Sequence, residues 1–152
     1  MTDTHAEVDR EQMASDFAET FKDKLPQETI ESATAHLRSA PQAAAANTAY
    51  SATGSVASLV IWTKCQCSIK GGKTFDGSVW GVTFPGGGAL FGDVYTDDVN
   101  ALYAKTTNFV LIAAYAYTTF IFLDEHGNAL GSFQAGSVST VGGQGGGSGH
   151  WK

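Results

Sequence analysis

The sequence is poor in positive charge and contains few prolines. Nine Lys and Arg stand against 15 Asp and Glu in 152 residues, a formal net charge of −6, and there are only three prolines beside 18 glycines. A chain with so little positive charge cannot neutralise a phosphate backbone, so we expect no nucleic-acid partner. Because glycine destabilises helices, its abundance indicates that much of the chain is tightly turned β structure.

Cysteine is also scarce, and the two cysteines stand at Cys65 and Cys67. On a strand these side chains share one face with Cα atoms about 6.5 Å apart, near the upper limit for a disulfide. The four histidines are scattered, and no second pair of residues has metal-ligand spacing. The sequence therefore predicts two buried, unreactive thiols and no metal site.

Long apolar segments are missing as well. The first twelve residues are polar and acidic, so this chain shows no secretory signal peptide, and it stays in the cytoplasm, leaves by another route or has lost a signal. Residues 109–123 carry no charge, but as a helix they would rise only about 22 Å, short of a bilayer core of about 30 Å. Their aromatic and β-branched side chains favour two strands broken near Ala113 and Ala114.

Glycine and charge divide the chain into two parts. Residues 1–40 hold nine acidic and four basic side chains and no glycine, whereas every glycine lies in the remaining 112 residues. We therefore expect an acidic helical segment with a linker at residues 1–46 and a β domain at residues 47–152.

A helical hairpin is predicted in the first part. Met13, Phe17 and Phe21 recur at helical spacing on a helix over residues 8–24, and a second helix over 27–38 stops before Pro41. The hairpin is either a docked or frayed appendage or a pair of partner-binding helices. In the second case Met13, Phe17 and Phe21 are candidate membrane or partner contacts, because carboxylates lose charge as the pH falls toward about 4 and the stripe then enters lipid more easily.

Seven or eight short strands follow at roughly ten-residue spacing. One strand includes residues 56–62 and continues to 69; further strands are expected at 75–84, 89–95, twice within 109–123, at 130–136 and from 138 onward. A helix of about nine residues, with Thr96 as its N-cap, interrupts the series. A closed antiparallel barrel explains this pattern more economically than a sandwich, with one set of alternate side chains in the lumen and the other partly covered by the helices.

Catalytic and cofactor motifs are incomplete. Gly71-Gly72-Lys73-Thr74 ends like a phosphate-binding loop, but its first required glycine falls at Cys67. Asp124, Glu125 and His126 occupy a predicted hairpin tip, where solvated polar residues are usual, and no Gly-x-Ser-x-Gly elbow is present. We predict no catalytic residue and no cofactor, and acid–base chemistry at the Asp124 to His126 tip remains the enzymatic alternative.

Three stretches resemble a known family when they are taken together. They are GGGALFGDVYTD at 86–97, FLDEHGNALGSFQAG at 122–136 and GGGSGHW at 145–151. In order and spacing they resemble the virulence-associated (Vap) proteins of Rhodococcus equi over about residues 50–152. The resemblance implies a compact eight-stranded antiparallel β-barrel with one short helix. It also implies a secreted, non-enzymatic effector that associates with membranes and acts in the phagosome or lysosome of a host cell. The family offers no site residue that could be assigned to a position of this sequence.

The expected function is therefore binding to a membrane or to a host or target-cell component in an acidic compartment. Two alternatives stay open. In the first, the barrel binds a small apolar ligand. In the second, the chain is a cytoplasmic relative with an unrelated structural role.

Overall fold

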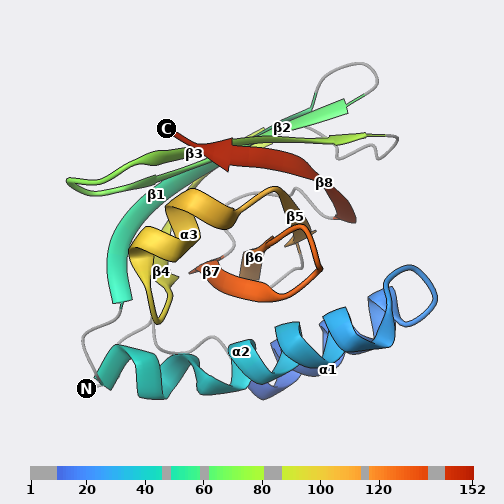
Figure 1. Cartoon of the computed structure of the whole chain (residues 1–152). Helices are drawn as coiled ribbons and strands as arrows, with labels where there is room; N and C mark the ends of the chain where they lie inside the picture. Colours follow the sequence, from blue (N-terminus) through green and yellow to red (C-terminus); the bar gives the residue numbers. More distant parts are fainter. Residues whose placement is uncertain (1–9, 46–48, 59–61, 81–86, 114–116, 137–142) are drawn as a thin grey trace.

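A computed structural model describes residues 10–45, 49–58, 62–80, 87–113, 117–136 and 143–152 (Figure 1). Its helices are α1 (Arg10–Phe21), α2 (Gln27–Ala45) and α3 (Val99–Lys105). Its strands are β1 (Ala49–Ser58), β2 (Trp62–Ile69), β3 (Thr74–Trp80), β4 (Gly87–Tyr95), β5 (Asn108–Ala113), β6 (Tyr117–Leu123), β7 (Ala129–Gly136) and β8 (Gly143–Trp151).

The strands close into an antiparallel barrel in the order β1-β2-β3-β8-β5-β6-β7-β4. This confirms the predicted fold class: an eight-stranded barrel with one short internal helix, preceded by a helical segment. The uncharged run forms β5 and β6 as expected, and β6 pairs with β7 across the predicted turn. Closure gives each strand two hydrogen-bonded neighbours, so the barrel has no free edge.

Two predicted boundaries were wrong. Helix α2 does not stop before Pro41 but continues to Ala45, so residues 43–45 are helical and do not form a linker. Pro41 removes one amide donor and crowds the preceding turn, but the alanines that end α2 have the highest helix propensity, and the helix continues past it. The expected single strand to residue 69 is two antiparallel strands, β1 and β2. Apolar residues at both parities and the lack of a turn residue hid the break, which falls outside the described residues.

The predicted cap of α3 was also wrong. Asp98, and not Thr96, is the N-cap: its Oδ1 accepts hydrogen bonds from the amides of Asn100 and Ala101 at 3.0 and 3.1 Å. Thr96 Oγ1 instead donates to the carbonyl of Leu130 on β7 at 2.8 Å. The helix therefore has seven residues, and Thr96 ties its start to the barrel wall.

Alternate side chains of β5 and β6 lie on opposite sides of the barrel wall, as predicted. Phe109, Leu111, Phe120 and Phe122 belong to the lumen cluster, whereas their neighbours on the same strands belong to a second cluster outside the barrel. The lumen is filled by aromatic rings whose centroids lie 4.9 to 6.5 Å apart, mostly edge to face: Phe75, Phe109, Phe120, Phe122, Phe133 and Trp151.

Glycine is required where β8 approaches β3 most closely. A Cβ atom on Gly147 would lie 1.8 Å from the carbonyl oxygen of Ser78, an overlap that only a backbone shift relieves. On the neighbouring Gly146, a Cβ atom would meet Val110 at an ordinary 3.4 Å. The glycine run of β8 is therefore a packing requirement at some positions and not at others.

We predict that Gly147→Ala lowers the free energy of unfolding by about 2 to 3 kcal/mol, because β3 and β8 must separate. Gly146→Ala is the matched control on the same strand and should change it by less than about 0.5 kcal/mol. Urea titration followed by circular dichroism measures both values. Equal effects of the two substitutions would contradict this account of β8.

Candidate functional site

The helical hairpin formed by α1 and α2 packs on the outside of the barrel. Figure 1 shows the two helices side by side beneath β6 and β7. Between hairpin and barrel lies one apolar cluster, named the hairpin interface here. Its buried members are Met13, Ala14, Phe17, Phe21, Ile30, Ala33 and Leu37 on the helices and Val110, Ile112, Tyr117, Ile121 and Leu123 on β5 and β6.

The candidate membrane or partner contacts lie inside this interface. Met13 and Phe17 are 0% exposed and Phe21 is 3% exposed. The helical spacing thus identified a real apolar stripe, and the structure shows that the barrel covers it. Contact of Met13, Phe17 and Phe21 with a membrane stays a prediction and requires the hairpin to leave the barrel.

Few polar contacts cross the hairpin interface. Tyr117 donates its hydroxyl to Asp16 Oδ2 at 2.6 Å, and the amide of Ala129 donates to Ser32 Oγ at 2.9 Å. Burial, and then the hydrogen bond and charge of Asp16, raise the pKa of Tyr117, so its hydroxyl stays a donor to Asp16. These bonds set the position of the helices, while the apolar side chains supply most of the attraction.

A third polar contact joins α2 to β7. His36 Nε2 lies 2.9 Å from Ser132 Oγ, which also accepts a hydrogen bond from Gln134 Nε2 at 3.0 Å. Ser132 is 0% exposed. Burial lowers the pKa of His36 from 6.5 to about 4, and the charge of Asp97 offsets this only in part. Sequence reasoning missed this pair because 96 positions separate the two residues.

A serine beside a histidine invites a comparison with nucleophilic catalysis, where an imidazole takes the proton from a hydroxyl. Here the hydroxyl is wholly buried, and the depressions that we find along the described residues are lined by neither Ser132 nor His36. None of these depressions reaches the pair, so the geometry gives no support for catalysis there. The contact serves the packing of α2 on the barrel.

The tip at Asp124, Glu125 and His126 forms a hydrogen-bonded turn. Asp124 Oδ1 accepts from the amides of His126 and Asn128 at 2.8 and 2.9 Å. Burial alone would raise the pKa of Asp124, but these hydrogen bonds outweigh it and lower the pKa. Glu125 and His126 are both about three-quarters exposed. The carboxylate of Asp124 therefore shapes the turn, and the three side chains do not converge on a nucleophile among the described residues.

Metal and thiol chemistry find no support among the described residues, which contain no group of three or more potential metal ligands. Cys65 and Cys67 are free, 0% exposed and face the lumen. Burial raises the pKa of Cys65 to about 12 and raises that of Cys67 as well. The predicted pair of buried thiols is confirmed.

Both thiols should resist labelling in the native protein. At pH 8 a thiolate-specific reagent should modify neither Cys65 nor Cys67 within minutes, because each thiol is protonated and enclosed. In 8 M urea, a condition chosen to unfold the chain, both should react at the rate of a free cysteine. Mass spectrometry counts the labels, and fast modification of one native thiol would show that the lumen opens.

The described residues contain no helix long and apolar enough to span a bilayer. The architecture so far is a small closed β-barrel with a filled lumen and an external helical cover. No curated protein matched the chain. The model of the Rhodococcus equi virulence-associated protein family matches residues 2–152, and the chain belongs to this family.

Two solved structures from the same pathogen are similar to the chain. Virulence-associated protein VapB of Rhodococcus equi shares 39% identity with a TM-score of 0.64, covering 68% of this chain and 95% of its own. VapD of Rhodococcus equi shares 34% identity with a TM-score of 0.65, covering 68% and 96%. The matched share of this chain, about two thirds, equals the size of the barrel without the hairpin.

Proposed function

We propose that the protein is a virulence-associated effector that binds membranes in an acidic compartment through the apolar stripe of Met13, Phe17 and Phe21, which the barrel now covers. Family membership supports the virulence role. The observation that carries the membrane role is the hairpin interface, in which the apolar stripe of the helices and the apolar outer side of β5 and β6 cover each other.

The geometry suits such a transition because the barrel closes through its own strands. The ladders that join β5, β6 and β7 to their neighbours include no residue of α1 or α2. Leaving the barrel would cost the hairpin its apolar contacts and a few hydrogen bonds but would break no ladder. A bilayer interface would then bury the helical stripe in place of the barrel wall.

The charge of the hairpin determines how membrane binding should depend on pH. The outer side of the hairpin carries exposed carboxylates, among them Glu11 and Glu19, which are 70 and 76% exposed. At neutral pH this charge opposes approach to an anionic membrane, and acidification removes part of it. Binding should therefore strengthen as the pH falls.

The lumen offers less to the alternative of a small apolar ligand. Rings from five strands already occupy it, and Phe75, Phe120 and Phe133 are each 0% exposed. A ligand would have to displace closely packed side chains, and each displacement would cost packing energy. Native mass spectrometry of the purified protein tests this alternative directly, since a carried ligand adds mass.

We predict that the protein floats with liposomes of mixed anionic and zwitterionic lipids at pH 4.5 and much less at pH 7. The double variant Phe17→Ser, Phe21→Ser should lose the binding at pH 4.5, because the stripe can no longer enter lipid. Phe91→Ser is the control: Phe91 is 56% exposed on β4, so losing it tests whether the barrel surface binds instead.

Three results would contradict the proposal: no flotation at either pH, equal flotation at both, or loss in Phe91→Ser with binding retained in the double variant. Far-ultraviolet circular dichroism must show the β-barrel spectrum in each variant.

A further inference from the structure

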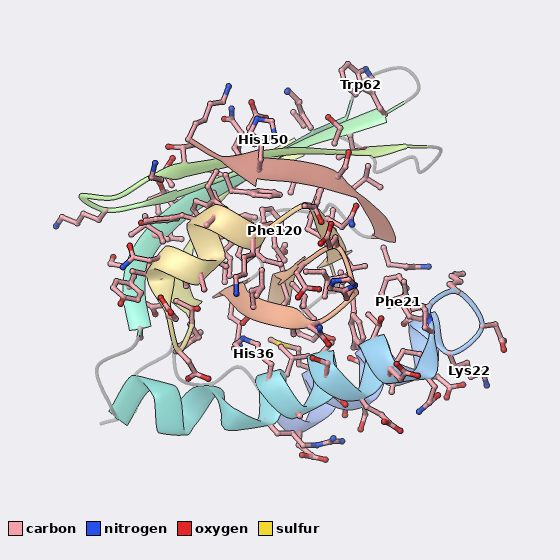
Figure 2. The ribbon with its side chains drawn as sticks, in the orientation of Figure 1. Phe21, Lys22, His36, Trp62, Phe120 and His150 are labelled. Atoms are coloured by element: carbon pink, nitrogen blue, oxygen red, sulfur yellow. The ribbon has the colours of Figure 1, made fainter. Side chains whose placement is uncertain are left out.

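The contact between His36 and Ser132 is unusual among the contacts that hold the hairpin, because it joins a half-buried imidazole, a group that titrates in mild acid, to a buried hydroxyl. Figure 2 shows His36 on the side of α2 that faces the barrel. Its Nε2 lies 2.9 Å from the wholly buried hydroxyl of Ser132 on β7. Gln134, 5% exposed, donates to the same hydroxyl oxygen. The imidazole thus lies on a buried polar spot of the barrel wall.

We propose that this contact is an acid-sensitive fastening of the hairpin: protonation of His36 shifts the docking equilibrium of α1 and α2 toward release, which uncovers the hairpin interface. The inference rests on the proposed function for its biological purpose, because release would expose the surface assigned to membranes. The release itself concerns this chain alone.

Hydrogen-bond roles explain why the docked state favours the neutral ring. With Nε2 unprotonated, Ser132 donates its hydroxyl proton to His36 while accepting from Gln134. Protonation turns Nε2 into a donor, so the hydroxyl oxygen then receives two donors and its own proton must find another acceptor. A positive charge is also placed where water cannot solvate it fully.

Neighbouring ionisable groups do not reverse this preference. On α1, the Glu11 carboxylate meets Arg38 and the Asp16 carboxylate accepts from Tyr117 of β6. Strand β7 has no ionisable side chain, and β4 contributes Asp93 and Tyr95. Asp97, which follows β4, attracts a proton to His36, yet desolvation outweighs that attraction.

The sign of the pH dependence follows from linkage. The docked ring has a pKa near 4, against 6.5 for a solvated one, so the released state binds the proton more readily. Docking is fully favoured above about pH 6.5, and this contribution is lost progressively as the pH falls from 6.5 to 4. Between pH 7 and pH 4.5 the docking equilibrium shifts roughly 50-fold toward release.

Release should also be visible without any membrane. Once undocked, α1 has 12 residues, a length at which an isolated helix is marginal in water, and the 19 residues of α2 include Pro41, which weakens a helix. Their amide protons therefore lose protection against exchange with solvent. The barrel strands β2 and β3, which contribute no described residue to the interface cluster, should keep theirs.

The test is hydrogen–deuterium exchange by mass spectrometry on the full chain without lipid, at pH 7 and pH 4.5, corrected for intrinsic exchange rates. We expect protection of residues 10–45 to fall by roughly 50-fold at pH 4.5, with β2 and β3 unchanged. His36→Gln keeps an amide near Ser132 but cannot titrate, and should stay protected at both pH values. His126→Gln removes a 75% exposed imidazole on the turn between β6 and β7 and should behave like the unchanged chain.

The proposal is overturned if the hairpin stays protected at pH 4.5, if His36→Gln loses protection as the unchanged chain does, or if the barrel strands open together with the hairpin. Should His36→Gln be unprotected even at pH 7, His36→Leu replaces it as the non-titrating variant and the same criteria apply. Release without flotation would refute membrane binding and leave the acid-sensitive contact standing, whereas flotation without release would do the opposite.

Discussion

The structure depends on one constraint: β5 and β6 are apolar on both sides of the barrel wall, so the wall cannot face water on its outer side. Val110, Ile112 and Ile121 point away from the lumen and would expose a contiguous apolar surface. The hairpin provides the cover, and in return the barrel shields the stripe of α1. Neither surface suits water alone, which makes their mutual burial the basis of both the fold and its proposed function.

The interior of the barrel satisfies a different requirement. Large rings fill a narrow lumen in edge-to-face contacts, and glycines such as Gly147 let the surrounding strands approach. Such packing gives a rigid wall with little room for a ligand. A rigid lumen and an outer surface covered by the hairpin together favour a protein that acts through its surface.

Polar groups at the hairpin interface restrict how the cover can leave. The hydrogen bond between Tyr117 and Asp16 orients α1, and Ser32 accepts a hydrogen bond from the amide of Ala129. His36 adds dependence on pH, because the same burial that makes its contact specific also penalises its charged form. The apolar area therefore supplies most of the stability of the hairpin interface, and the imidazole of His36 makes that stability depend on pH.

Much of this was determined locally by the sequence. Period-two patterns and turn residues located most strands, helical spacing identified Met13, Phe17 and Phe21 as one stripe, and three motifs indicated the family. Tertiary structure decided where the elements end and which side chains pack against each other. Local spacing cannot show that β1 and β2 are separate, that α2 passes Pro41, or that Asp98 caps α3, because hydrogen bonding and packing settle element ends. Nor can it pair His36 with Ser132, since residues so distant in sequence become neighbours only when a closed barrel and a docked helix bring their side chains to one buried spot.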